Sequence, residues 1–233
     1  MSNNVENSKI KKNYSEIALH YLREQIIDGK MQPGEKIIEN NISEQLNISR
    51  GPVRDALKQL AVEGLVDYHP NKGCTVALLS PKDAYEVFFL RGSLEKLALE
   101  KSGCHLDTYG LLVMESALDK IRSLAEADNL LEEVEADEKF HSQIVLSCQI
   151  SRLYKMWELL SPLNGAMFLL LKNIRSCFGD ENFTKSSGSR LVHSHERIFE
   201  AIKSQNLSEA CQALDDHYLK NGEIIYRHSL TDL

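Results

Sequence analysis

The sequence predicts a mainly α-helical protein with two domains. Apolar residues recur every three or four positions along most of the chain, which is the period of a helix packed on one face. Short apolar runs at residues 65–68 and 75–78 flank a Pro/Asn/Gly turn, which is typical of a β-hairpin. We therefore expect three helices and a hairpin in residues 1–79, followed by an all-α helical bundle in residues 80–233.

The composition is that of a globular protein, with 42% hydrophobic and 26% charged residues. No apolar run is long enough to span a bilayer, and the N-terminus lacks the apolar core of an export signal. The five cysteines are scattered and odd in number, which fits a reducing compartment. We expect a cytoplasmic protein without a membrane partner.

The net charge of −7 does not by itself suggest a nucleic-acid partner. Residues 1–79 carry 10 Lys/Arg and 10 Asp/Glu, so the excess of acidic groups lies entirely in the remaining 17 Lys/Arg and 24 Asp/Glu. A neutral domain whose basic groups gather on one face can still bind phosphates.

The first domain is expected to begin with a polar arm, residues 1–12, and a helix that ends at Gly29. Two short helices then follow within residues 41–66. Asn47 lies in the turn between them, and Ser49 is suited to cap the second. That second helix has a core-facing side and a basic outer side. The core-facing residues are Val53, Ala56, Leu57 and Leu60, and the basic residues are Arg50, Arg54 and Lys58.

A short helix with an anchored inner face and a basic outer face can enter a DNA major groove. The alternative is an ordinary helical hairpin with a solvated basic edge. Lys72 lies near the tip of the predicted β-hairpin and is either a DNA contact or an incidental surface lysine.

The motifs SRGPVRDAL and EGLV, preceded by GKMQPGEKI, resemble the winged helix-turn-helix signature of GntR-type bacterial transcription regulators. The resemblance implies a homodimer that binds palindromic double-stranded DNA through Arg50, Gly51, Arg54, Lys58 and Lys72. Asn40 and Asn41 stand where related regulators often place charged DNA contacts.

The second domain is expected to open with a capping box at Ser80-Pro81-Lys82-Asp83. Pro162 should kink the fourth helix of this domain, and residues 177–188 should form its longest loop. Six helices are predicted here, at about 82–102, 107–127, 130–148, 151–175, 187–204 and 207–228.

Polar residues occupy the apolar seams of these helices at Asp137, His141, His195 and His217. Burying one carboxylate and three imidazoles without partners would be costly. A divalent transition metal would pair them all, with zinc first and nickel, manganese or iron as alternatives. A hydrogen-bonded core network is the other interpretation.

The same residues resemble the ligand-sensing C-terminal domain of the FadR-type branch of these regulators. Its metal-binding members carry Asp-x3-His, found here in DEKFH, and two further histidines, found here in SHERIFEAI and DDHYL. The resemblance implies that Asp137, His141, His195 and His217 are the metal ligands. The chain departs from the pattern at Ile150, near where the family usually has Asn.

Arg91 also falls in an apolar seam, with Glu95 one turn further on, and RGSLE matches the family pattern R-x2-L-E. An inward arginine can bind a carboxylate with two parallel hydrogen bonds. We assign both residues to effector binding; an Arg91–Glu95 ion pair or a subunit bridge is the alternative.

These features predict a ligand-responsive DNA-binding transcription regulator, taken as a repressor, that senses a small organic acid at a metal site and is not an enzyme. A regulator for which the ion itself is the signal is one alternative. The other is a helical metallohydrolase, for which Glu95 is the one candidate base.

Overall fold

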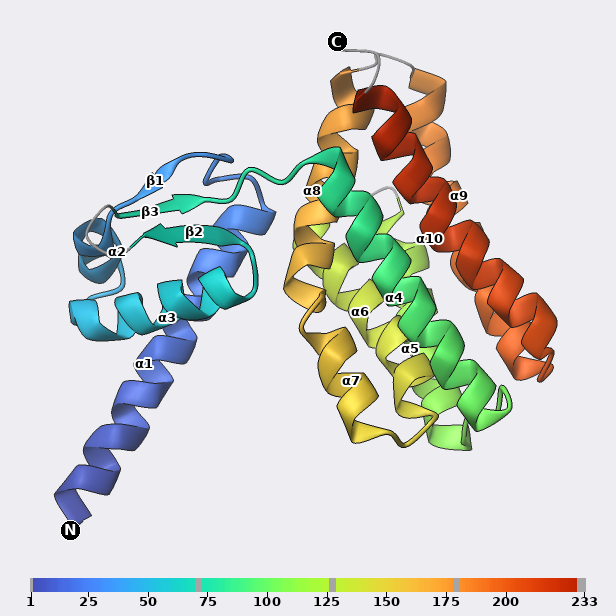
Figure 1. Cartoon of the computed structure of the whole chain (residues 1–233), viewed down its shortest axis with the longest axis horizontal. Coiled ribbons are helices and arrows are strands. Elements are labelled where there is room, and N and C mark those ends of the chain that lie inside the picture. The colour runs from blue at the N-terminus through green and yellow to red at the C-terminus, as the bar shows by residue number, and fades with distance from the viewer. Residues whose placement is uncertain (1, 70–72, 126–128, 178–180, 230–233) are drawn as a thin grey trace. The chain divides into compact units, whose positions relative to one another are not determined.

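A computed structural model describes residues 2–69, 73–125, 129–177 and 181–229, and side chains for residues 14–69, 73–125, 129–170 and 189–219. The chain divides into two compact units, Met1–Leu79 and Ser80–Leu233 (Figure 1). Helices dominate both, and strands occur only in the first unit among the described residues, so the predicted fold class is confirmed.

The first unit combines three helices with a small antiparallel sheet. The helices are α1 (Ser2–Ile27), α2 (Glu39–Gln45) and α3 (Arg50–Val62), and the strands are β1 (Lys36–Ile37), β2 (Val66–His69) and β3 (Gly73–Val76). The strand order is β1-β3-β2, and the predicted hairpin pairs Val66 with Val76 and His69 with Gly73. Strand β1 was not predicted. Lys72 lies outside the described residues.

Helix α3 packs as its apolar period predicts, with Val53, Ala56, Leu57 and Leu60 all buried, and it lies against α1. Asn47 in the preceding turn adopts a left-handed conformation, with φ of 50°, which asparagine tolerates better than most residues. Ser49 occupies the N-cap position but its side chain makes no capping hydrogen bond. Helix α3 is therefore held mainly by its buried face.

The expectation of a polar arm at residues 1–12 is wrong. Helix α1 begins at Ser2, and neither glycine nor proline interrupts the chain between Ser2 and Ile27. Lysine and glutamate have high helix propensity although they are polar, so a polar segment is not necessarily an irregular one.

The second unit is a bundle of helices. Its helices are α4 (Pro81–Ser102), α5 (Thr108–Leu124), α6 (Leu130–Leu146), α7 (Ser151–Glu158), α8 (Ser161–Cys177), α9 (Glu181–Lys203) and α10 (Leu207–Ser229). Within the described parts of the chain, we find no helix that is both long and apolar enough to cross a membrane.

Two sequence expectations for this unit are wrong. The fourth predicted helix, 151–175, is two helices, α7 and α8. Pro162 has no N–H to continue the hydrogen bonding of α7, and it lies in the first turn of α8, where proline is tolerated. The expected loop at 177–188 is helical from Glu181 onward, and residues 178–180 lie outside the described residues.

Helix α4 packs against α6, α7, α8 and α10 and so forms much of the bundle's interior. Its start is the predicted capping box. The Asp83 backbone N–H donates to Ser80 Oγ at 3.2 Å, and the Ser80 N–H donates to Asp83 Oδ2 at 2.7 Å. The helix ends at Gly103, whose φ of 64° is a conformation that glycine adopts without strain.

Replacing Ser80 by alanine should lower the free energy of unfolding of the second unit by about 1 kcal/mol, because one backbone N–H loses its acceptor. Urea denaturation followed by tryptophan fluorescence measures this directly, since Trp157 is the single tryptophan and lies buried in this unit. Ser123→Ala, at an exposed position of α5, is the control and should leave the midpoint unchanged. Equal midpoints for the two variants would contradict the capping role.

Candidate metal centre and nucleic-acid interface

The outer side of α3 presents the predicted basic residues to solvent. The side chains of Arg50 and Arg54 are 58% and 45% exposed, and Lys58 and Gly51 are also exposed. A cleft of about 550 Å³ runs beside these basic side chains, and strands β2 and β3 contribute to its lining through Tyr68 and Cys74. This surface offers positive charge and a concave shape at one place, as a DNA backbone requires.

Glu39, at the start of α2, was not singled out from the sequence and lies among these cations. Arg54 donates two hydrogen bonds to it, Nε to Oε1 at 3.0 Å and Nη2 to Oε2 at 2.7 Å, and Arg50 Nη2 donates to Oε2 at 3.3 Å. The hydrogen bond from Arg54 chiefly lowers the pKa of Glu39, against the effect of partial burial. Glu39 therefore orients the Arg54 guanidinium by a two-point contact.

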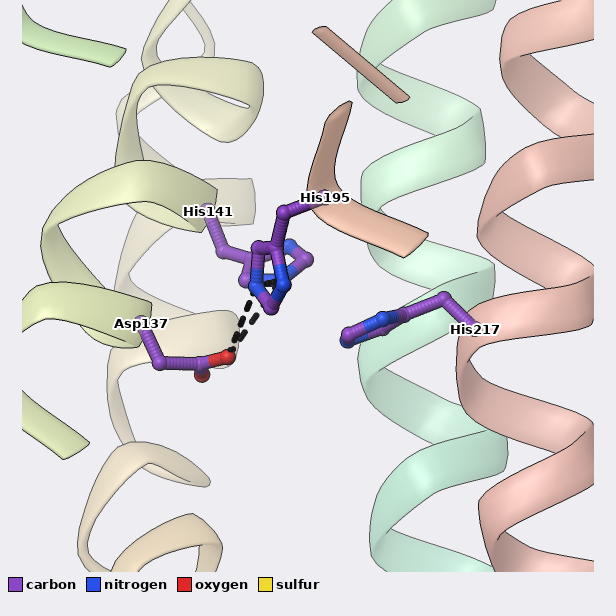
Figure 2. A group of neighbouring side chains, drawn as sticks. All are labelled: Asp137, His141, His195 and His217. Atoms are coloured by element: carbon purple, nitrogen blue, oxygen red, sulfur yellow. Dashed lines mark hydrogen bonds and ion pairs between the residues drawn. The ribbon is translucent and has the colours of Figure 1, made fainter. Parts of the chain in front are cut away.

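The four seam residues of the second unit meet at one point. Asp137 and His141 lie on α6, His195 on α9 and His217 on α10, and each offers a nitrogen or oxygen within 4.8 Å of the others. Figure 2 shows the four side chains converging, with Asp137 and His141 coming from the same helix. All four are buried, at 6% exposure or less, so the helical period correctly predicted their orientation.

In each imidazole ring, Nε2 faces the other three side chains, and Nδ1 is the outer nitrogen. The outer nitrogens of His141 and His195 each have a hydrogen-bond acceptor. His141 Nδ1 donates to Glu95 Oε2 at 2.7 Å, and His195 Nδ1 donates to the Leu191 carbonyl at 2.8 Å. In a neutral imidazole only one nitrogen carries a proton. These acceptors therefore place the proton on Nδ1 and leave the Nε2 lone pair pointing to the centre.

The Nδ1 atom of His217 also has an acceptor, which is the hydroxyl group of Ser194. Ser194 Oγ donates to the Leu191 carbonyl at 2.8 Å, so its lone pair accepts from His217 Nδ1 at 3.0 Å. The three imidazoles thus present their Nε2 atoms together, each with its outer nitrogen held by a neighbour. Such outer contacts orient metal-ligating histidines.

The Nε2 atoms of His141 and His195 and the Oδ1 atom of Asp137 lie close together, so their lone pairs face one another. His141 Nε2 is 3.2 Å from His195 Nε2, and Asp137 Oδ1 is 3.1 Å from His195 Nε2 and 3.6 Å from His141 Nε2. With the outer protons in place, these atoms repel one another unless a proton or a cation lies between them. Three imidazole nitrogens and one carboxylate oxygen form a donor set that suits a divalent transition metal.

The local charges favour an ionised Asp137 and a neutral His217. Burial acts to raise the pKa of Asp137, but His141, His195 and His217 outweigh it and lower that pKa. Burial and the two neighbouring histidines lower the pKa of His217 well below its usual value, so this ring is neutral at neutral pH. Burial acts to lower the pKa of His141, but Glu95 and Asp137 outweigh it and raise that pKa, so a metal ion competes with a proton at this ring. An ionised carboxylate beside a neutral imidazole is the protonation state that binds a metal.

Arg91 is fully buried, as its position in a seam predicted, but its carboxylate partner is Glu138. Arg91 Nη1 lies 2.8 Å from Glu138 Oε1, so the ion pair of Arg91 is with Glu138, and not with Glu95 as the alternative interpretation had it. The guanidinium carbon is 4.4 Å from the centre of the Trp157 ring. No nitrogen of the guanidinium makes a hydrogen bond of good geometry within the described structure. Buried N–H groups that lack a well-formed hydrogen bond are suited to an anionic ligand.

Asn164 is a further residue of the site that the sequence did not reveal. Its side-chain amide, 1% exposed, donates to Asp137 Oδ2 and to Glu138 Oε1, both at 2.9 Å. It comes from α8, far along the chain from both acceptors. Spacing within one helix indicates which residues share a face and carries no signal for such a contact.

The architecture is that of a transcription regulator with a DNA-binding unit and a separate helical unit, and comparison with known proteins identifies both. Residues 13–76 match the family of bacterial regulatory proteins called the gntR family, and residues 86–220 match the FCD domain. The chain belongs to the GntR family of transcription regulators, as the sequence motifs predicted. These families and relatives are regulators rather than enzymes.

Two characterised relatives are repressors. The gluconate operon transcriptional repressor of Bacillus subtilis is 27% identical over 84% of this chain and 79% of its own length. The transcriptional repressor GlaR of Escherichia coli is 26% identical over 88% of this chain and 92% of its own.

Solved structures share the fold. E. coli McbR/YncC is similar with a TM-score of 0.74 and 21% identity, over 93% of this chain and 98% of that one. A GntR regulator from Rhodococcus sp. RHA1 has a TM-score of 0.73 and 22% identity, over 92% and 98%.

Asn164→Asp should lower the free energy of unfolding of the metal-free protein by about 1–3 kcal/mol, because a donor between two carboxylates becomes a third carboxylate. Urea denaturation in a chelator, followed by Trp157 fluorescence, measures it. Asn164→Ala removes the donors without adding charge and should cost less, although aspartate matches asparagine better in shape. The reverse ranking would show that the amide acts by packing.

Proposed function

We propose that this regulator is a homodimeric repressor whose second unit binds a divalent transition metal and responds to a small organic acid. The observation that carries the proposal is the convergence of three imidazole Nε2 atoms and one carboxylate oxygen, with every outer nitrogen already hydrogen-bonded. The proposed ligands are Asp137, His141, His195 and His217, with zinc preferred and nickel, manganese or iron as alternatives.

In the first unit, Arg50 and Arg54 are the proposed base or phosphate contacts, and Gly51 allows close approach to the DNA. Lys58 and Lys72 are assigned to phosphate. A palindromic operator needs two such units related by a two-fold axis, which is why we propose a homodimer. We assign dimer formation and effector binding to residues 80–233.

The effector proposal rests on the Arg91 guanidinium. It is buried, positively charged and without a well-formed hydrogen bond in the described structure, so a carboxylate that reaches it would gain two strong hydrogen bonds. A bound metal ion would add positive charge nearby. One relative is named for the gluconate operon, which supports an organic acid as the class of effector.

One alternative is favoured by a specific observation: four protein groups lie together, which is the number of ligands in a closed zinc site, so the ion itself could be the signal. Titrating zinc against operator affinity, with and without organic acids, separates the two. Operator release that requires the acid supports the effector. Release by zinc alone supports a metal sensor.

His195→Ala should reduce bound zinc from about one ion per chain to a small fraction, because the remaining donors lose a central ligand. Elemental analysis of the purified protein after dialysis against zinc measures this. His193→Ala is a matched control, since His193 is exposed on the same helix. Equal zinc content in the two variants, or none in the unaltered protein, would exclude the site.

Arg54→Ala should weaken specific operator binding at least about tenfold, because one good two-point contact to a base contributes about 1–3 kcal/mol to discrimination. A gel-shift titration measures the loss, and zinc content should be unchanged.

The substitution also leaves Glu39 without its main partner, which adds repulsion toward phosphate. The double variant Glu39→Gln/Arg54→Ala separates the two effects. It should remain weak if Arg54 contacts DNA, and recovery of full affinity would show that exposure of Glu39 caused the loss.

A further inference from the structure

Glu95 lies directly behind the proposed metal centre and is completely buried. Its Oε2 accepts from His141 Nδ1 at 2.7 Å. Its Oε1 accepts from Trp157 Nε1 at 2.8 Å and from the Tyr218 hydroxyl at 2.6 Å. The donors come from α6, α7 and α10, so one carboxylate on α4 joins three other helices.

The two oxygens of Glu95 therefore have separate roles. Trp157 Nε1 and the Tyr218 hydroxyl both donate to Oε1. With Oε1 fixed by two donors, the carboxylate plane cannot rotate freely, and Oε2 is held against His141. A carboxylate without such donors would be costly to bury.

The Nδ1 atom of His141 has a charged acceptor, the carboxylate of Glu95. The outer nitrogens of His195 and His217 contact a carbonyl and a hydroxyl, which are neutral. A carboxylate fixes the orientation of an imidazole more firmly and makes its other nitrogen a stronger metal donor.

The charges of the cluster also fit a dication. With neutral histidines, Asp137 and Glu95 contribute two negative charges, while Arg91 and Glu138 compensate each other. A divalent cation at the centre brings the sum of these buried charges to zero. Without Glu95, the same ion would leave one positive charge in the core, which is unfavourable in a medium of low polarity.

From this geometry we infer that Glu95 is the positioning residue of the centre: it presents His141 Nε2 to the metal and supplies the second compensating charge. The inference rests on the proposed metal site. It assigns Glu95 to the support of the metal ligand, in place of the direct effector contact that its position in the sequence predicted.

Glu95→Gln should weaken zinc binding about 10–100-fold, since loss of an outer partner of a metal-binding histidine has effects of this size. Competition titration with a chromophoric zinc chelator measures the dissociation constant. At saturating zinc the stoichiometry should remain one ion per chain, because all four ligands are still present. Unchanged affinity would overturn the inference.

Glu100→Gln is the matched control, because it makes the same change at an exposed position of the same helix. Its zinc affinity should be unchanged. If Glu100→Gln weakens zinc binding as much as Glu95→Gln does, the loss reflects net charge alone and the inference fails.

A measurement on the unaltered protein covers the case in which Glu95→Gln does not fold. Histidine 15N NMR of the zinc-loaded protein should show His141 with a proton on Nδ1 and zinc on Nε2. The opposite arrangement would overturn the inference. If the unaltered protein binds no zinc, the proposed site fails, whereas stoichiometric zinc with an unaffected Glu95→Gln variant rejects only the role of Glu95.

Discussion

The arrangement of the second unit depends on a buried group of nitrogen and oxygen atoms whose lone pairs need a proton or a cation. Three imidazole nitrogens and a carboxylate oxygen lie within 4.8 Å of one another in a core that excludes water. Helices α6, α9 and α10 must meet there because each carries part of the group. The outer contacts extend the requirement to α4 and α8, through Glu95 and Asn164. A hydrophobic core alone would tolerate many packings, whereas these directional contacts specify one.

The sequence predicted what depends on local periodicity and on capping. The seam positions of Asp137, His141, His195 and His217 are buried, and the capping box at the start of α4 is present. Boundaries were less accurate. Residues 181–188 include two serines and a glycine and yet lie in α9, because weak propensity is overridden where a helix extends from a neighbouring turn.

The contacts that complete both sites could not be predicted from spacing. Glu39 reaches Arg54 across 15 positions, His141 reaches Glu95 across 46, and Tyr218 reaches Glu95 across 123. Residues on one helix are related by its 3.6-residue period, but helices from distant segments are related only through the tertiary fold. The sequence therefore indicated the buried Asp/His cluster and the basic face, and the structure was needed to identify the groups that orient them.

Helix α4 connects these sites to the rest of the chain in a way that suits regulation. It starts at Pro81, directly after the boundary between the two units, and it carries both Arg91 and Glu95. An effector can regulate only by binding one arrangement of the protein more tightly than another. A carboxylate bound to Arg91 would act on α4, and the first turn of α4 directly follows the first unit in the chain. Arg91 and Glu95 lie on the same helix, and Trp157 contacts Arg91 with its ring and Glu95 with its N–H. Because Glu95 also accepts from His141, α4 links Arg91 to the group of histidines around Asp137.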